Sequence, residues 1–430
     1  MYDWANSVYS LTITTAIFPD FFAAVSEEIA VNKAGIAAGE KAIVPFFGIE
    51  IKSAALYSFS ITFAYIIISL ISPVLAGMAD SSGSKKKYMI GFCLMGSIAC
   101  GSLYGFDAQH YEFGVLMFSL AAIGFAGGNI FNDAFLPEIT GPKNYARVSA
   151  RGYSMGYVGS VILLLFNLFM VLNPEMFFDE LTMSEGEMKG AAVRISFLTV
   201  AVWWFGFAQI TFFSLKDIRP AVRLTRPFSR GWQELRTVLG QIARLPRIRR
   251  FLFAFFFFNM GMQTVLYMAS IFGKVEIRLK TEELIISMLL IQLIAIPGSA
   301  LFAWLAGKIG SIKTLLAGIA CWIPILWYSW FIEGPAGFYV AGAWVGLVMG
   351  GMQALSRATF SGLLPETKDT ASFFSFYSIM DKIAIICGTL VFGILSQFFD
   401  MRFGIQFLAV FFLLGGLMLY LMNRETAKEK

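Results

Sequence analysis

The sequence predicts an all-α polytopic membrane protein with twelve transmembrane helices, arranged as two parallel six-helix repeats. Apolar residues make up 57% of the 430 residues and charged residues only 14%, which is too little charge to cover a soluble surface of this size. The apolar residues gather in continuous runs long enough for a helix to cross roughly 30 Å of hydrocarbon. Short motifs of the first half also return in the same order in the second half, which indicates two bundles that run in the same direction.

Ten of the predicted spans are uncharged runs of at least 19 residues, and the first and eleventh are equally apolar but carry charged residues. In chain order the twelve spans are 4–26, 53–79, 88–106, 113–132, 152–174, 195–215, 251–273, 284–307, 314–332, 334–356, 371–399 and 403–423. The runs are continuously apolar and do not alternate, so strands of a membrane barrel are disfavoured.

The internal repeat fixes the predicted domain organisation. Three motifs recur at matching places relative to the spans: GMADSSGSKKK at 77–87 with WLAGKIGSIK at 304–313, LPE at 136–138 and 364–366, and YS at 153–154 and 377–378. Three matches in order are improbable by chance, and a long period of this kind indicates duplicated bundles. We therefore predict an N-terminal six-helix bundle over 1–214, a basic cytoplasmic linker over 215–250 and a C-terminal six-helix bundle over 251–430.

The distribution of Lys and Arg predicts the orientation. The loops on one side hold 22 of the 33 basic residues and those on the other side hold nine. The richer side should be cytoplasmic, which places both termini inside. The net charge of +5 therefore reflects topology and gives no indication of nucleic-acid binding. Because only three residues precede the first span, no cleavable signal peptide is expected, and the native chain either extends upstream of Met1 or begins there.

The linker contains one amphipathic stretch. Its apolar residues Trp232, Leu235, Leu239 and Ile242 recur at helical spacing, and polar residues occupy the other faces. This pattern predicts a helix that lies on the inner membrane surface and ends before Pro246. We expect it to link the two bundles mechanically, with a regulatory partner site as the alternative.

Residues for catalysis or metal binding are scarce. The four cysteines lie inside apolar spans without the spacing of a metal site. The single histidine, His110, lies on a predicted outer loop, so a histidine relay, a zinc helix or a Ser-His-Asp triad cannot be assembled. The sequence also has no Walker loop and no dinucleotide fingerprint. We expect no enzyme activity, no cofactor and no metal site.

The loop at 77–87 resembles the signature between the second and third helices of the major facilitator superfamily. The first glycine of this loop permits close helix approach, and the second makes a tight turn. The resemblance implies an inner gate that latches the cytoplasmic side closed, formed by Gly77, Asp80, Gly83, Lys85 and Lys86. In the second copy of the motif Gly307 stands where the aspartate would be, so the C-terminal latch lacks its carboxylate.

Four longer segments resemble the vacuole-effluxer-like branch of that superfamily, the autophagy-related permeases with their bacterial members. The segments are YDWANSVYSLTITTAIFP at the start, NIFNDAFLPEI at 129–139, GGMQALSRATFSGLLPE at 350–366 and FFSFYSIMDK at 373–382. The resemblance implies a monomeric secondary active transporter in a bacterial inner membrane, and its fungal members are associated with amino-acid efflux from the vacuole. Met260 stands where members of the family often carry an aspartate, so a role that rests on that carboxylate is not carried over.

Polar residues within the spans indicate a solute cavity, because burying them in lipid is costly. In the major facilitator fold the first, fourth, seventh and tenth helices line the central cavity, and they carry Asn6, Tyr9, Asn129, Asn132, Asn259, Gln263 and Gln353. Each residue alone could be a polar contact between helices. Together they are better explained by a polar cavity for a small polar or zwitterionic solute.

Four charged residues complete the candidate site. Asp133 and Arg357 lie at the cytoplasmic ends of the fourth and tenth spans, where they either snorkel or form a gate salt bridge. Asp381 and Lys382 lie ~15 Å along their helix from its inner end and are the deepest charges. Adjacent residues point about 100° apart on a helix, so we expect no good pair between these two and at least one other neighbour. A proton-coupling role, a bond from Lys382 to a solute carboxylate, and a fixed salt bridge all stay open.

The predicted function is secondary active transport of small polar metabolites by alternating access. The family resemblance alone implies amino acids as the solute and efflux as the direction. Protons are the candidate coupling ion. One alternative is a proton-coupled multidrug or lipid exporter, which the 16% aromatic content favours and the polar helix faces disfavour. Another is a permease-like sensor or scaffold that transports nothing.

Overall fold

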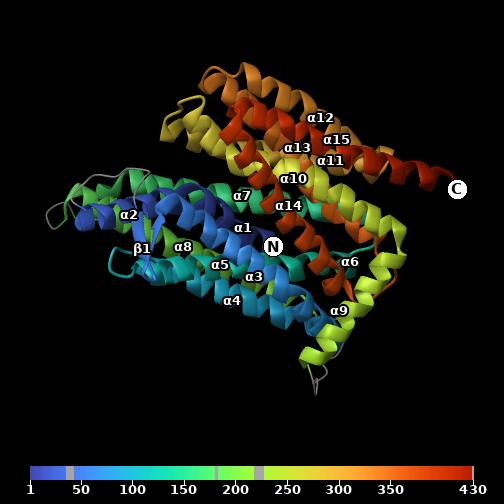
Figure 1. Ribbon diagram of the computed structural model, residues 1–430. Coiled ribbons are helices and arrows are strands. Elements are labelled where there is room, and N and C mark those ends of the chain that lie inside the picture. The colour runs from blue at the N-terminus through green and yellow to red at the C-terminus, as the bar shows by residue number, and fades with distance from the viewer. Residues whose placement is uncertain (35–42, 180–182, 217–226, 429–430) are drawn as a thin grey trace. The chain divides into compact units, whose positions relative to one another are not determined.

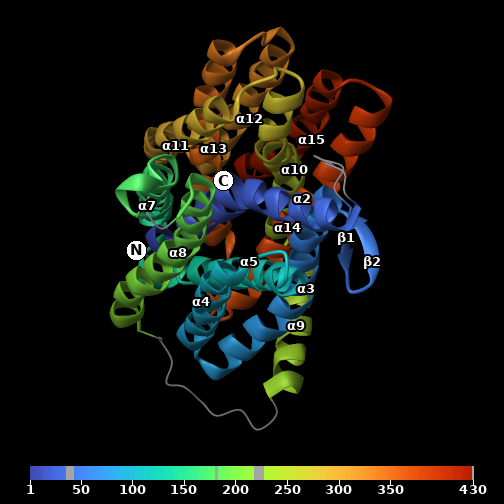
Figure 2. The same ribbon diagram turned by 90° about the vertical axis from the view of Figure 1, so that its left-hand side faces the viewer.

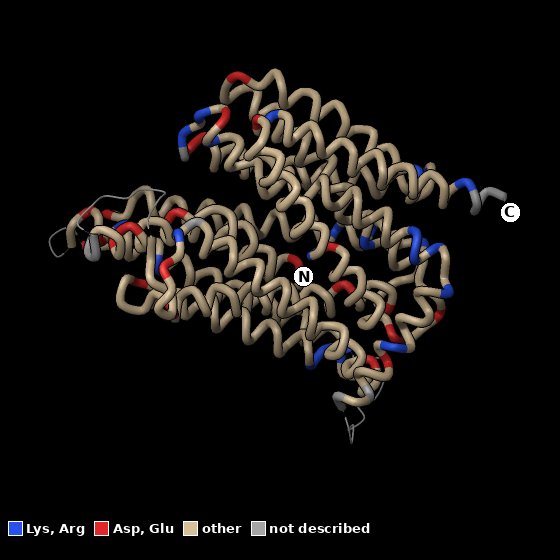
Figure 3. Tube along the Cα trace, in the orientation of Figure 1, with Lys and Arg blue, Asp and Glu red and all other residues tan. Residues whose placement is uncertain are grey.

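The computed structural model describes residues 1–34, 43–179, 183–216 and 227–428, and within them twelve helices are long and apolar enough to cross a membrane. The predicted number of spans is therefore confirmed (Figure 1). Charged residues gather near the helix ends and leave the middles almost free of charge (Figure 3), which is the distribution that a hydrocarbon layer requires.

The first half of the chain contains six spans and a small hairpin. The first span is composed of α1 Tyr2–Val8, the π-helix η1 Tyr9–Ile17 and α2 Phe18–Ala34. The hairpin strands β1 Ile43–Phe46 and β2 Ile49–Lys52 pair antiparallel, with Val44 opposite Ile51. The next elements are α3 Ser53–Ser82, α4 Lys85–Ser102, η3 Leu103–Gly105, α5 Tyr111–Ala134, α6 Leu136–Ile139, η4 Pro142–Asn144, α7 Tyr145–Leu172, η5 Pro174–Met176 and α8 Glu185–Ser214.

The second half begins with the linker helix α9 Pro227–Arg244. The remaining elements are α10 Pro246–Val275, α11 Thr281–Ile309, α12 Ser311–Tyr328, η6 Ser329–Phe331, α13 Pro335–Leu363, α14 Thr370–Phe398 and α15 Met401–Lys428. Glycines allow α11 and α13 to approach closely, because a Cβ at Gly350 would lie 2.4 Å from the carbonyl oxygen of Ala295. Small residues at such contacts are the usual means of packing helices in membranes.

The first span and the hairpin contain two features that the sequence pattern did not predict. Residues 9–17 form a π-helix within the span. Pro19, two residues after its end, has no N–H to donate to a carbonyl of the preceding turn. The hairpin turns at Phe47 and Gly48, both with positive φ, and β1 packs against α2 (Figure 2).

The helix predicted within the linker is present, and α9 ends before Pro246. Only part of its apolar stripe packs on protein. Leu235, Val238 and Ile242 are buried, whereas Trp232 and Leu239 are about half exposed. Hydropathy spacing identified the apolar stripe but not which of its residues pack on protein. The position of α9 at the membrane surface stays a prediction.

The described residues divide by their contacts into two compact units. Unit 1 contains residues 1–71, 86–129 and 158–216, and unit 2 contains residues 72–85, 130–157 and 217–430. Parts of α3, α5 and α7 thus belong to unit 2, where they contact elements of the second half. The division into bundles 1–214 and 251–430 stays a prediction.

Candidate functional site

The turn between α3 and α4 positions the first functional carboxylate, and we call the end of the helices where it lies the latch side. Gly83 has φ +68°, a conformation that glycine adopts without strain. Its N–H donates to the carbonyl of Asp80 at 3.3 Å, and the N–H of Ser84 donates to that of Ala79 at 3.1 Å. This is the glycine-terminated helix end known as the Schellman motif. The predicted tight turn at Gly83 is therefore confirmed.

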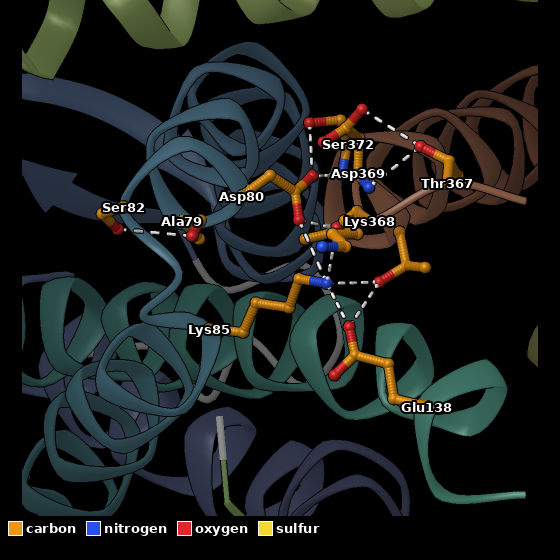
Figure 4. A network of polar contacts seen from close by, with 11 residues as sticks. Ala79, Asp80, Ser82, Lys85, Glu138, Thr367, Lys368, Asp369 and Ser372 are labelled. Carbon is orange, nitrogen blue, oxygen red and sulfur yellow. Dashed lines mark hydrogen bonds and ion pairs between the residues drawn. The ribbon is translucent and has the colours of Figure 1, made fainter. Parts of the chain in front are cut away.

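Asp80 caps the first turn of α14 (Figure 4). It is fully buried, and its Oδ2 accepts hydrogen bonds of 2.7 Å from both the N–H and the hydroxyl of Ser372. Its Oδ1 accepts a bond of 3.3 Å from the N–H of Ala371. A helix N-terminus presents unpaired N–H groups and a partial positive charge, so a carboxylate from another helix is stabilised there. This contact ties the end of α3 to the start of α14.

Lys85 joins that carboxylate to two further elements. Its Nζ lies 3.2 Å from Oδ1 of Asp80 and forms an ion pair with Glu138 of α6. It also donates to the hydroxyl of Thr370 at 2.6 Å and to the carbonyl of Lys368 at 3.1 Å. A buried ammonium is favourable only with such complete pairing. The network therefore connects the ends of α3, α4, α6 and α14.

The remaining predicted gate residues serve other contacts. Gly77 contacts the linker helix, because a Cβ there would lie 2.5 Å from the carbonyl oxygen of Gly231 in α9. Lys86 donates to the carbonyl of Leu215 at the end of α8, at 3.0 Å. The sequence analysis missed Glu138 and Ser372. Glu138 carried a signal, because it stands in the repeated LPE motif, whereas Ser372 carried none.

Asp133 and Arg357 form the second cluster on the latch side. Arg357 is 4% exposed, and one of its terminal nitrogens lies 2.8 Å from Oδ1 of Asp133. Its Nε and its other terminal nitrogen donate to the hydroxyl and the carbonyl of Ser149 in α7, at 2.9 and 3.1 Å. The guanidinium also lies 4.5 Å from the centre of the Tyr153 ring. Of the two possibilities left open for Arg357, the structure contains the salt bridge and not a snorkelling side chain.

Asp381 and Lys382 lie in the middle third of α14 and pair with each other. Nζ of Lys382 lies 2.6 Å from Oδ2 of Asp381, so the expectation that neighbouring residues cannot pair was wrong. The backbone directions do diverge, but the four-carbon stem of lysine is long enough to turn back to the preceding residue. The expected additional neighbours are present, because Asn259 and Gln263 of α10 donate to Oδ1 of Asp381 at 2.8 and 3.1 Å.

The pair is mostly buried but not fully enclosed. The side chain of Lys382 is 13% exposed and that of Asp381 is 18% exposed. Asn259 is buried beneath them, and Gln263 is partly exposed. The cluster therefore combines a buried amide with two opposite, partly exposed charges. Such an arrangement is able to bind a polar solute.

The other predicted cavity residues form separate contacts. Asn6 is buried and donates to Asn129 at 2.8 Å within unit 1. Tyr9 is also buried and donates to the carbonyl of Phe118 at 3.3 Å. In unit 2, Gln353 accepts a bond of 2.9 Å from Tyr157, and Asn132 is partly buried. Among the described residues no group of three or more His, Cys, Asp or Glu could hold a metal ion.

Comparison with known proteins identifies the family. The family model described as "Vacuole effluxer Atg22 like" matches residues 1–430. The chain belongs to the vacuole effluxer Atg22-like family. The resemblance of the 77–87 loop and of the four longer segments is thereby confirmed.

Individual relatives agree with this assignment. The uncharacterized MFS-type transporter YxiO of Bacillus subtilis (strain 168) is 29% identical, over 100% of this chain and 95% of that protein. Autophagy-related protein 22 of Eremothecium gossypii is 23% identical, over 86% of this chain and 78% of that protein. The fucose:proton symporter FucP of E. coli has the same fold, with a TM-score of 0.67 at 14% identity over 98% of this chain and 97% of that chain. This vacuole effluxer-like protein is an integral membrane protein of the major facilitator superfamily, a secondary transporter and not an enzyme.

Proposed function

We propose that the protein transports small zwitterionic solutes, amino acids in the first place, and that Asp381 and Lys382 bind their two charges. The observation that carries this proposal is the ion pair of 2.6 Å within α14, together with the amide donors of Asn259 and Gln263. The name "Vacuole effluxer" of the family model supports export as the direction.

The division of bonds on Asp381 supports a zwitterion in particular. The two amides occupy Oδ1, and Lys382 occupies Oδ2. When Lys382 turns toward a solute carboxylate, Oδ2 is left for the solute ammonium, and Oδ1 keeps its amides. One ion pair is exchanged for two, and the site has zero net charge both empty and loaded. A buried site of this kind disfavours solutes with a net charge, because they would leave one charge uncompensated.

The latch-side contacts support alternating access. Within unit 2 they connect α3, α6 and α7, which precede the linker, with α13 and α14, which follow it. We propose that these contacts close the cytoplasmic side and break when that side opens. The excess of Lys and Arg supports the cytoplasmic assignment of the latch side and of both termini. We further propose a functional monomer in a bacterial plasma membrane, with protons as the coupling ion.

Counterflow in proteoliposomes tests the proposal. Vesicles loaded with unlabelled amino acids should accumulate the labelled amino acid when they contain the wild-type protein. Lys382→Ala should abolish this exchange. Asp381→Asn keeps an oxygen for the ammonium, so it should retain counterflow but lose the response to a pH gradient. Lys52→Ala, at the end of the hairpin, is the matched control and should behave as the wild type.

The outcomes separate the alternatives. If both variants retain wild-type gradient-driven transport, the pair is structural and the binding site lies elsewhere. Wild-type exchange of apolar drugs or lipids without exchange of amino acids would instead indicate a multidrug or lipid exporter. No exchange of any solute would favour a sensor or scaffold.

A further inference from the structure

A pocket of about 790 Å³ opens on the latch side of unit 2, away from Asp80 and from the Asp381–Lys382 pair. Its wall consists of residues 142–147 at the start of α7, 303–304 and 306–313 around the turn between α11 and α12, 358–359 and 362–363 near the end of α13, and Asn423.

Among the residues that the structure describes, the charged residues that line the pocket are all positive. Its lining residues include Lys143, Arg147, Lys308 and Lys313 and no Asp or Glu. All four basic side chains are exposed, and none forms an ion pair with another residue in the described ranges. The ammonium of Lys308 lies 4.0 Å above the ring of Trp304. A concave site with four uncompensated positive charges favours an anion.

The internal repeat places this pocket where the first copy of the turn has a carboxylate. The turn 304–313 corresponds to the turn 77–87, and in both copies the turn glycine has positive φ, +68° at Gly83 and +89° at Gly310. In the first copy the carboxylate of Asp80 lies between its lysine and the start of α14. In the second copy Gly307 replaces that aspartate and Ile312 replaces Lys85, while Lys313 matches Lys86 and Lys308 is an added basic residue. The start of α7 lines an open pocket there.

The pocket lies where phospholipid headgroups would lie. Candidate spans begin or end there at Pro142, Ile309, Ser311, Leu363 and Arg424, so the pocket is at the level where the hydrocarbon ends and the phosphates begin. Trp304 lies about one turn deeper along α11 and is 57% exposed. An exposed tryptophan at that depth is typical of a side chain in contact with lipid.

We propose that this pocket binds the phosphate headgroup of an anionic membrane phospholipid, with the acyl chains running along the face of Trp304. The lipid phosphate takes the place in the second repeat that the carboxylate of Asp80 occupies in the first. The bound lipid joins the start of α7 to the turn between α11 and α12. Membrane composition therefore affects the latch-side contacts of the second repeat without touching the solute site.

Fluorescence quenching tests this inference. The protein is reconstituted with phosphatidylglycerol or phosphatidylcholine whose acyl chains carry bromine, and the signal of Trp304 is obtained by subtracting the Trp304→Phe variant. Brominated phosphatidylglycerol should quench Trp304 at lower mole fraction than brominated phosphatidylcholine. Lys308→Gln combined with Lys313→Gln should lower the apparent affinity for phosphatidylglycerol about 30-fold, because each basic residue near the phosphates contributes about a factor of five to the affinity.

One control and one further pocket variant make the result decisive. Lys87→Gln combined with Arg244→Gln removes the same charge from exposed positions outside the pocket and should leave the preference for phosphatidylglycerol intact. Arg147→Gln is a second pocket variant and should also weaken binding. Equal quenching by the two lipids in the wild type, or an unchanged preference in both pocket variants, would overturn the proposal. Displacement of phosphatidylglycerol by millimolar inorganic phosphate would assign the pocket to a soluble anion and overturn the assignment to lipid.

Discussion

Replacing Asp80 by Asn tests whether the network at the start of α14 is a latch. The substitution keeps the shape of the side chain and removes its charge. Asp80 accepts hydrogen bonds of 2.7, 2.7 and 3.3 Å from α14 and forms an ion pair of 3.2 Å with Lys85. The negative charge strengthens all of these interactions, whereas the α-helical structure of α3 does not require it. We therefore expect normal membrane insertion and a destabilised closed state.

The size of the effect follows from the number of charged contacts. A hydrogen bond to a charged group contributes about 1.5–3 kcal/mol and a neutral one about 0.5–1.5 kcal/mol, so each bond weakens by roughly 1 kcal/mol. The two short bonds from Ser372 together lose about 2 kcal/mol, before the ion pair with Lys85 is counted. Because 1.4 kcal/mol corresponds to a factor of ten, the equilibrium should shift roughly 30-fold or more toward the open state.

A buried alanine on the latch side provides the reporter. Ala358 of α13 is 4% exposed and packs against Leu136 and Tyr145, so a cysteine there should react slowly in the closed state and much faster when this interface opens. In a background without the four native cysteines, Ala358→Cys is labelled with a membrane-impermeant maleimide in inside-out vesicles. The labelling rate should rise in proportion to the open population. Adding Asp80→Asn should increase it roughly 30-fold.

Asp107→Asn is the matched control, because in the part of the chain that the structure describes Asp107 bonds only within its own loop, to the backbone of Gln109 and to His110. It should leave the labelling rate unchanged. Unchanged labelling together with unchanged transport in Asp80→Asn would refute the assignment of Asp80 to a gate. A higher rate in both variants would show that the reporter detects general loosening and not the opening of this interface.

Three further outcomes are expected. Gly77→Ala should destabilise the protein by about 1–3 kcal/mol in thermal melts, because its Cβ would overlap the carbonyl of Gly231, whereas Gly91→Ala has open space and should melt no lower than the wild type. Arg357→Lys keeps the charge but loses the forked bonds to α7, so reporter labelling should rise about tenfold. Trp232 should be shielded from aqueous quenchers in vesicles, and Trp232→Glu should make the linker sensitive to protease; full quenching in vesicles would contradict a helix bound to the membrane surface.

The spans were predictable because hydropathy is a property of local composition. The seventh span was predicted at 251–273 and extends over Pro246–Val275, and the eleventh was predicted at 371–399 and extends over Thr370–Phe398. The ends differ where charged or polar residues continue the helix beyond the hydrocarbon. The π-helical turn at Tyr9–Ile17 was not predictable in this way, because the same apolar run is compatible with both helix types.

The candidate site was predicted in part, because side-chain partners depend on contacts between distant segments. The acidic member of the turn at 77–87 was identified, but Ser372 is 292 residues away along the chain, and one serine among many carries no mark of that contact. The pairing of Lys382 with Asp381 was missed for another reason. Helix geometry gives the direction of the backbone bonds, and a lysine of that length is not confined to that direction.

The contact between Gly77 and Gly231 has a consequence for the order in which the protein is made. The helix that carries Gly77 leaves the ribosome well before α9 exists, and the surface that α9 covers stays open in the interval. Asp80, one turn further along α3, must also wait for Ser372. A nascent chain of six spans therefore exposes, at the same end, the Asp80 carboxylate without its partners on α14 and the Gly77 surface without α9. The first half of the protein completes its own surface only after most of the second half has been synthesised.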